Sequence, residues 1–340
     1  MDAIAFWLPV VWAAIIGIAV ALYVILDGFD LGLGILFPFF RVGTERDQSM
    51  NAIAPVWDGN ETWLVLGGGG LLAAFPLAYA IILPALYAPL IAMLLGLVFR
   101  GVAFEFRWRD PGHRPLWDAG FFLGSVVATF MQGVTLGALL QGIEVNGRAY
   151  GGGWWDWLTP FSLLTGAGLV VGYALLGSAW LIWKTSGPIQ ADARRYAIRL
   201  LPALFVAIGL VSLYTPFLEG QYWRRWFEAP GLYVAVPMPL LVLGTTWLLW
   251  RSLRRDTDWH PFLFALILFL LSMVGLAISM WPDVIPGRVS IWQAAAPYES
   301  QLFMLVGAGI LVPVILAYTA WSYWVFRGKV GEEGYHAHGH

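Results

Sequence analysis

The stretch NAIAPVWDGNETWLVLGGGGLLAAF, residues 51–75, decides how this chain is built. It is apolar enough to lie in lipid, yet it carries Asp58, Asn60 and Glu61 near one end and four consecutive glycines further on. An ionisable group at the centre of a bilayer costs on the order of 3 kcal/mol on insertion scales, so it is rarely there by accident. What these carboxylates can do therefore depends on where the stretch lies relative to the membrane.

The composition predicts an all-α polytopic membrane protein. Of the 340 residues, 59% are hydrophobic and only 12% are charged, whereas soluble domains carry about 25% charged residues. We expect a single transmembrane domain over residues 1–330 and a disordered cytoplasmic tail over residues 331–340. The absence of cysteine excludes disulfides and thiolate sites. The net charge of −2 gives no reason to expect nucleic acid as a partner.

Hydropathy places most of the membrane spans, since a span needs roughly 20 apolar residues. The N-terminal segment is apolar for too long, and lacks the basic start, to be a cleaved signal, so we expect it to be kept as a span. Residues 51–100 are ambiguous: they form either one span after an interfacial segment, or two spans joined by a tight turn at residues 74–77. The remaining spans are expected near residues 5–38, 117–142, 160–183, 200–218, 231–250, 261–281 and 301–326.

The basic residues favour two spans within this ambiguous region. Lys and Arg gather in short cytoplasmic loops, and most of the 19 in this chain lie in five segments, at residues 41–46, 100–114, 184–199, 251–255 and 327–329. If all five face the cytoplasm, the chain crosses the membrane twice between Arg46 and Arg100. This predicts about nine spans, with the N-terminus periplasmic and the C-terminus cytoplasmic. An eight-span alternative, with residues 51–75 on the outer surface, would place Arg41 and Arg46 outside.

Ionisable residues in three of the expected spans point to a common cluster. Asp27 and Asp30 are three residues apart and share a helical face. Antiparallel helices would bring Asp30 and Asp58 to a similar depth in the cytoplasmic half, with Glu61 one turn deeper and Arg100 as a natural charge partner. The cluster is either a structural ion-pair network or a path for protons or ions, because desolvated carboxyl groups can exchange protons near neutral pH.

The glycines in these spans are best explained by helix packing. Gly28 and Gly32 form a small-xxx-small pair that lets another helix backbone approach closely, and residues 67–70 have the same explanation. No GK[ST] sequence follows them, so they do not form a phosphate-binding loop.

The histidines argue against a haem or metal site within this chain alone. His113 and His260 fall in inner loops and His336, His338 and His340 in the tail, so no span contains one. A haem buried in a bilayer usually takes a histidine ligand. The chain also lacks a nucleophile with a base and a Walker motif. We therefore expect no bound cofactor, no complete active site, and catalysis only together with a partner.

Several motifs resemble subunit II of the cytochrome bd family of quinol oxidases. They are DGFDLGLGILFPF at residues 27–39, the WDGNE segment with its glycine run at residues 50–80, VFRGVAFEFR at residues 98–107, and the C-terminal run at residues 300–329. The resemblance covers essentially the whole chain. The compact periplasmic loops are similar to those of the cyanide-insensitive branch.

The resemblance implies a fold and a function. The family oxidises membrane quinol and reduces O2 to water, taking protons from the cytoplasm, and two b-type haems and one d-type haem lie chiefly in subunit I. Subunit II has two four-helix bundles plus a peripheral helix and packs against subunit I. For this chain the resemblance implies the bacterial inner membrane, subunit I, quinol and lipid as partners, and allows a small single-span accessory subunit.

The resemblance also assigns residues. Asp58 matches the family carboxylate associated with proton delivery from the cytoplasm, and Glu61 stands where some members have Gln, which makes a second carboxylate in the path possible here. Supporting polar roles fall to Trp57, Asn60, Asp27, Asp30 and Arg100.

A second function class fits the same carboxylates. An ion-coupled secondary transporter could bind a coupling ion through Asp30, Asp58 and Glu61. Such a protein would work alone and would often contain an inverted repeat. No clear repeat is present in this chain.

Overall fold

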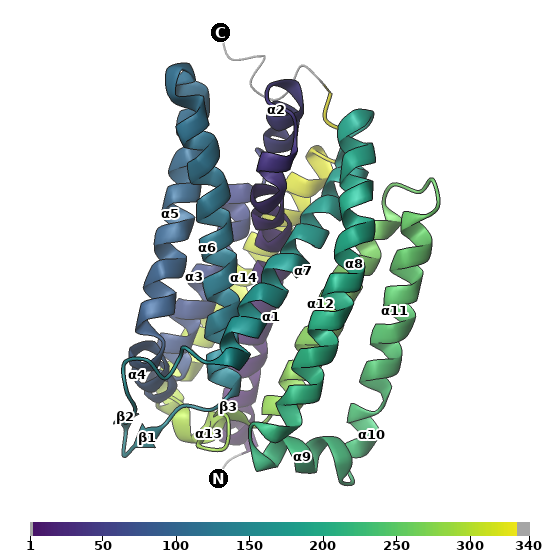
Figure 1. Cartoon of the computed structure of the whole chain (residues 1–340). Coiled ribbons are helices and arrows are strands. Elements are labelled where there is room, and N and C mark those ends of the chain that lie inside the picture. The colour runs from purple at the N-terminus through teal and green to yellow at the C-terminus, as the bar shows by residue number, and fades with distance from the viewer. Residues whose placement is uncertain (1–2, 332–340) are drawn as a thin grey trace.

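The computed structural model describes residues 3–331. The tail histidines His336, His338 and His340, and most of the tail expected at residues 331–340, lie outside the described residues. The long helices run roughly side by side (Figure 1). We call the end of the molecule that carries α2 the α2 end and the opposite end, which carries α9, the α9 end.

Helices dominate the fold. The α-helices are α1 (Ala3–Leu36), α2 (Thr44–Asn51), α3 (Trp57–Ala74), α4 (Pro76–Ala85), α5 (Tyr87–Arg109), α6 (Arg114–Leu140), α7 (Pro160–Lys184), α8 (Pro188–Tyr214), α9 (Gly220–Phe227), α10 (Leu232–Ala235), α11 (Pro237–Leu253), α12 (His260–Met280), α13 (Ile291–Ala294) and α14 (Tyr298–Val325). Short 3-10 helices are Phe37–Phe39, Pro111–His113 and Thr215–Phe217. Two antiparallel hairpins pair β1 (Val145–Asn146) with β2 (Ala149–Tyr150) and β3 (Asp283–Ile285) with β4 (Val289–Ser290).

Within the described residues, 8 helical segments are long and apolar enough to cross a membrane. They are Ile4–Phe39, Tyr87–Arg109, Pro111–Leu140, Pro160–Lys184, Pro188–Phe217, Leu232–Leu253, His260–Met280 and Tyr298–Val325. The all-helical multi-span architecture is thereby confirmed. Helix α8 begins at residue 188, well before the span expected at residues 200–218, because an arginine-rich first part continues the same helix. Helix α3 does not qualify by hydropathy, since its first turns hold polar side chains and its middle holds glycines.

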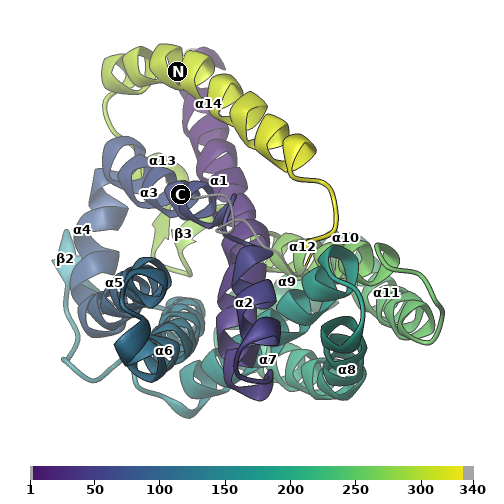
Figure 2. The same ribbon diagram turned by 90° about the horizontal axis from the view of Figure 1, so that it is seen from above.

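Helix α3 nevertheless lies antiparallel along α1. Asn60 contacts the first-span residue Asp30, Gly67 lies against Val20, and Gly70 lies against Ile16. As the residue number rises along α3, the residue number of the contacted position in α1 decreases, so the two helices are antiparallel. Figure 2 shows α3 beside α1 as the molecule is seen from above.

The chain breaks at residues 74–77 as expected, but this break does not join two long helices directly. A separate short helix, α4, lies between α3 and α5, so the next long helix begins only at Tyr87. The helix boundary falls at Phe75, whose ψ of 61° is not helical. Pro76 causes this break, because proline disfavours a helical conformation in the preceding residue and is favoured as the first residue of a new helix.

Helix α1 is the central element. It lies between α3, α5 and α6 on one side and α7, α8, α11 and α12 on the other (Figure 2). Its close approach to α7 depends on glycine: a Cβ added at Gly32 would overlap the carbonyl oxygen of Tyr173, and one added at Gly177 would overlap the backbone of α1. A Cβ at Gly28 would come within 2.8 Å of the Tyr173 ring. The packing expected at Gly28 and Gly32 is confirmed.

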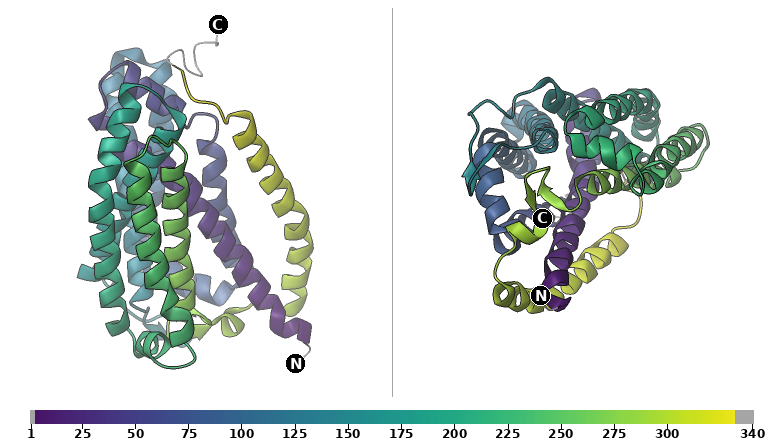
Figure 3. Two further views of the ribbon diagram at one scale, coloured as in Figure 1. Left: turned by 90° about the vertical axis from the view of Figure 1, so that its right-hand side faces the viewer. Right: turned by 90° about the horizontal axis from the view of Figure 1, so that it is seen from below.

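Helix α14 stands at the edge of the molecule. Figure 3 shows it beside α1 and apart from α8, α11 and α12. No residue in its most apolar 18-residue window is buried, and Phe303 is 83% exposed. Most of this long apolar helix is therefore available to lipid or to another protein.

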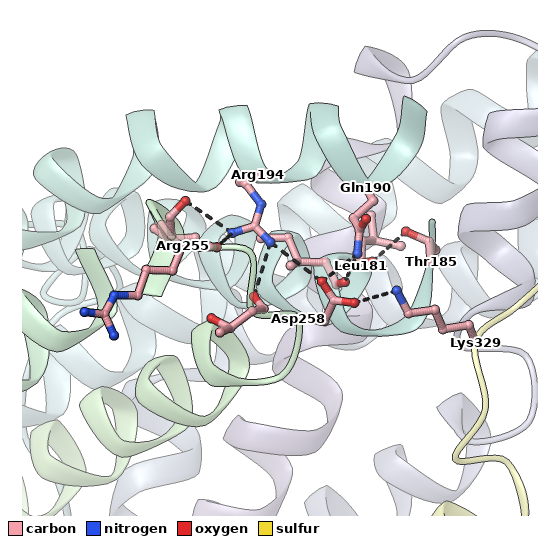
Figure 4. A network of polar contacts seen from close by, with 10 residues as sticks. Leu181, Thr185, Gln190, Arg194, Arg255, Asp258 and Lys329 are labelled. Carbon is pink, nitrogen blue, oxygen red and sulfur yellow. Dashed lines mark hydrogen bonds and ion pairs between the residues drawn. The ribbon is translucent and has the colours of Figure 1, made fainter. Parts of the chain in front are cut away.

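Polar contacts close the α2 end. Asp258 accepts hydrogen bonds from Lys329 Nζ at 2.6 Å and from Gln190 Nε2 at 3.0 Å (Figure 4). Arg194 donates a hydrogen bond to the carbonyl oxygen of Arg255 at 2.8 Å. The backbone N–H of Val330 also donates to the carbonyl oxygen of residue 184 at 2.8 Å. The segment after α14 is thus tied to α7, α8 and the connection between α11 and α12.

We predict that Gly32→Ala strongly lowers the amount of folded chain recovered from membranes. The new methyl group must displace the α7 backbone, and overpacking of this kind costs about 1–3 kcal/mol or more. Gly209→Ala is the control, because a Cβ at that position of α8 meets no atom within 4 Å. Equal recovery of the two variants, measured in detergent extracts, would refute the prediction.

Candidate functional site

A charged cluster lies buried between α1, α3 and α5. Arg100, on α5, is 1% exposed, and its Nη1 lies 3.1 Å from Asp27 Oδ1 and 2.5 Å from Glu61 Oε1. The guanidinium also lies over the ring of Trp57, 5.9 Å from its centroid. The same ring packs against Gly101. One cation therefore joins three helices, and the expected pairing of Arg100 with the carboxylates is confirmed.

A second chain of contacts begins at Asp30. Its Oδ2 accepts a hydrogen bond from Asn60 Nδ2 at 2.7 Å, and the Asn60 side-chain oxygen accepts one from the Tyr323 hydroxyl at 2.9 Å. Both Asp30 and Asn60 are buried. Tyr323 belongs to α14, so this chain of contacts reaches from α1 through α3 to the helix at the edge of the molecule.

The two carboxylates expected in a proton path have different surroundings. Glu61 is 26% exposed at its side chain and bonds to Arg100. Asp58 is exposed and makes no hydrogen bond or ion pair within the part of the chain that the structure describes. Asp58 and Glu61 still interact electrostatically. Asp58 therefore lies at the edge of the cluster, whereas Glu61 belongs to it.

Several buried polar atoms around the cluster have no hydrogen-bond partner among the described residues. They include Asp30 Oδ1 and Trp63 Nε1, and nearby Tyr23 interacts with Asp27, as Tyr173 does with Gln132. Buried polar groups normally bond to protein or to internal water. The region between α1, α3, α6 and α7 thus offers groups that can bind water or protons at membrane depth.

A second ionic cluster, at the α2 end, was not predicted from the sequence. Asp118 on α6 forms ion pairs with Arg107 Nε at 2.5 Å and with Arg46 Nη1 at 2.7 Å. Arg107 Nη1 also lies 2.7 Å from Asp47. A signal for it existed: Arg107 follows Arg100 by two helical turns and so projects from a similar face of α5. This cluster fixes α2 to α5 and α6.

The two histidines of the described residues are not placed to ligate one haem together. His113, 72% exposed, lies 2.9 Å from Asp110, and that hydrogen bond lowers the pKa of Asp110. His260 begins α12 and stacks on Trp259 at 4.0 Å. The two imidazoles come from helix ends on opposite sides of α1 and cannot ligate one iron together. Over residues 3–331, no group of three or more His, Asp or Glu is arranged to hold a metal ion.

These features define a class: a multi-span membrane protein whose few buried ionisable groups are held between helices. Comparison with known proteins identifies the family. The family model described as "Cytochrome bd terminal oxidase subunit II" matches residues 8–326. The chain belongs to this family. The resemblance inferred from the motifs is confirmed, and the chain is a multi-pass membrane subunit of a bd-type oxidase rather than an ion-coupled transporter.

Individual relatives cover nearly the whole chain. Cytochrome bd-I ubiquinol oxidase subunit 2 of Escherichia coli strain K12 is 30% identical, with 95% of each chain covered. Cytochrome bd ubiquinol oxidase subunit 2 of Bacillus subtilis strain 168 is 28% identical, with 95% of this chain and 96% of the relative covered. A chain from the structure of bd oxidase from Geobacillus thermodenitrificans has the same fold, with a TM-score of 0.75 at 16% identity, over 94% of this chain and 99% of that chain.

We predict that Arg100→Gln destabilises the protein by about 3–5 kcal/mol, because it leaves the buried Asp27 and the partly exposed Glu61 without their cation. Adding Glu61→Gln should restore part of the loss, since one of the two groups then carries no charge. Thermal unfolding of the purified complex measures both effects.

The control for Arg100→Gln is Arg109→Gln. Arg109 is on the same helix, but its side chain is 75% exposed and 3.8 Å from Glu105. An exposed ion pair contributes at most about 1 kcal/mol. If Arg100→Gln were no more harmful than Arg109→Gln, Arg100 would not hold the three helices together.

Proposed function

We propose that this chain is the haem-free subunit of a complex that oxidises membrane quinol and reduces O2 to water, and that it supplies protons from the cytoplasmic side. The haems, two of b type and one of d type, belong to subunit I in this proposal. The family membership and the unsuitable positions of His113 and His260 support it. The observation that carries the proton role is the buried Arg100 cluster with Asp58 at its edge.

We propose nine membrane crossings within a single transmembrane domain, with the α2 end in the cytoplasm. In this topology α1, α3, α5 and α6 form one four-helix bundle, α7, α8, α11 and α12 form the other, and α14 is peripheral. The antiparallel packing of α3 on α1 supports a crossing by α3, since 18 helical residues extend for about 27 Å. The basic segments, which gather at the α2 end, support the orientation.

We assign the proton route to Asp58 and then Glu61. Asp58 lies in the first turn of α3, the turn nearest the α2 end, and Glu61 lies one turn deeper. A proton taken up by Asp58 can move to Glu61 through a short water bridge, because both side chains are partly accessible. Arg100 holds Glu61 in place, and Asp27 supports Arg100 from the other side.

We propose that subunit I covers one face of α3 together with α14. Five exposed residues of α3 recur every three or four positions and so form one stripe, with the exposed Gly59 and Gly68 beside it: Asp58, Thr62, Val65, Gly69 and Leu72. A Cβ at Gly68 or Gly69 meets no atom within 4 Å, so a partner helix can approach closely there. An ionisable Asp58 on a membrane-facing surface also requires polar cover.

We predict that Asp58→Asn slows O2 consumption with quinol by at least about tenfold, since loss of a proton-transferring group costs about 10²–10⁴ in rate. Glu61→Gln should have a smaller effect because some family members have Gln at that position. Haem content and the yield of the complex should match the wild type. Oxygen uptake and the visible spectrum measure these quantities on one preparation.

Asp256→Asn, in the connection between α11 and α12, serves as the carboxylate control. Full activity of Asp58→Asn would eliminate the proton role. A variant that loses haem along with activity would instead assign Asp58 a structural role at the contact with subunit I.

We predict that Gly69→Leu prevents association with the haem-bearing subunit while the chain still inserts into the membrane. The leucine side chain would occupy the space that the partner helix needs. Gly244→Leu on α11 is the control, because Gly244 is also exposed and has no neighbour within 4 Å of its Cβ position. Haem that copurifies with tagged Gly69→Leu in wild-type amount would place the partner elsewhere.

A further inference from the structure

Asp30 is a buried carboxyl group that the proposed proton route does not use. Its exposed fraction is 0%, and the one hydrogen bond it makes among the described residues comes from a neutral group, Asn60 Nδ2, at 2.7 Å. Its other oxygen, Oδ1, is buried without a hydrogen-bond partner there. An ionised carboxylate in these surroundings has no bonded cation among the described residues to stabilise it.

Burial is the main influence against ionisation of Asp30, and the charges around it only partly offset that influence. Arg100 is the cation of this cluster, and its Nη1 is bonded to Asp27 at 3.1 Å and Glu61 at 2.5 Å. One positive charge therefore serves three carboxyl groups. Arg100 attracts a negative charge on Asp30, but Asp27 and Glu61 both repel it. The titratable and charged groups that face this cluster are Tyr23 and Asp27 from α1, Glu61 and Asp58 from α3, Arg100 from α5, Tyr173 from α7 and Tyr323 from α14.

We infer that Asp30 is a proton-binding site, occupied by a proton at neutral pH, while Asp27 and Glu61 share the charge of Arg100. As a neutral acid, Asp30 accepts the hydrogen bond from Asn60 at Oδ2 and carries the proton at Oδ1. The buried cluster then contains two carboxylates and one guanidinium instead of three carboxylates, so less uncompensated charge lies in the membrane.

Tyr323 is a positioning residue for this site. Its hydroxyl donates to the side-chain oxygen of Asn60 at 2.9 Å, which turns the amide nitrogen toward Asp30. Tyr323 belongs to α14, the helix on the proposed partner face. The orientation of Asn60, and with it the hydrogen bond to Asp30, therefore depends on the position of α14.

The bound proton lies beside the route through Glu61. Its use during turnover rests on the proposed function, whereas its presence on Asp30 does not. The site differs from Asp58, because Asp58 is exposed in this chain, while Asp30 is enclosed.

Infrared spectroscopy of the purified complex tests the inference directly. The complex is prepared with aspartate carrying ¹³C at the side-chain carboxyl and with unlabelled aspartate, and the Asp30→Asn spectrum is subtracted from that of the wild type at neutral pH. We expect a label-sensitive carbonyl band of a protonated carboxylic acid. A label-sensitive carboxylate band in its place would overturn the inference.

Asp258→Asn provides the matched reference for an ionised aspartate. Asp258 is 40% exposed at its side chain and pairs with Lys329 at 2.6 Å, so its difference spectrum should contain a carboxylate band. Tyr323→Phe provides a second variant in case Asp30→Asn does not accumulate. It should shift the protonated carbonyl band of Asp30 while haem content is retained, and a shift confined to carboxylate bands would contradict the inference.

The outcome is independent of the Asp58 experiment. Full activity of Asp58→Asn would remove the proton route and leave the Asp30 band in place. A carboxylate at Asp30 would remove the proton-binding site and leave the route through Asp58 intact.

Discussion

The fold depends on the cost of burying one guanidinium. Arginine keeps its charge under all ordinary conditions, so Arg100 requires anions wherever it lies, and at 1% exposure only protein groups can supply them. Asp27 and Glu61 do so from two different helices. These partners come from α1 and α3, so the need of Arg100 for anions determines how α1, α3 and α5 are arranged. The same ion pair stabilises the polar start of α3 against the rest of the chain. The second ionic cluster, around Asp118, repeats this principle where α2 meets α5 and α6.

Much of this arrangement could be predicted from the sequence because charge is informative in a membrane. The pairing of Arg100 with carboxylates and the shared depth of α1 and the start of α3 followed from counting residues between basic segments. The rotation of α3 about its axis did not. Asp58 and Glu61 are three positions apart, yet Asp58 is exposed and Glu61 bonds to Arg100. This difference depends on which side of α3 faces α5. The Asp118 cluster was missed since its members are spread over three helices, α2, α5 and α6.

The glycine run illustrates a second limit. Helix packing was the right explanation for Gly67 and Gly70, which lie against Val20 and Ile16, but Gly68 and Gly69 face away from the rest of the chain. Four consecutive residues necessarily point to all sides of a helix. A sequence therefore indicates that close approaches occur, but it does not say which of them are made within the chain and which are left for a neighbour. The break before α4 is the reverse case: its position at residues 74–77 was predicted, but the short helix that follows it was not.

The contacts that close the α2 end have a bearing on the order of assembly. Val330 donates to the carbonyl oxygen of Lys184 and accepts from Gln48, and Lys329 reaches Asp258. Residues 329 and 330 leave the ribosome after every helix that they connect. Until then α2, α7 and the connection before α12 lack the contacts that residues 329 and 330 make with them. Forming these contacts is a late step of biogenesis, and a nascent chain that stops before residue 329 would have its helices in place but not these contacts.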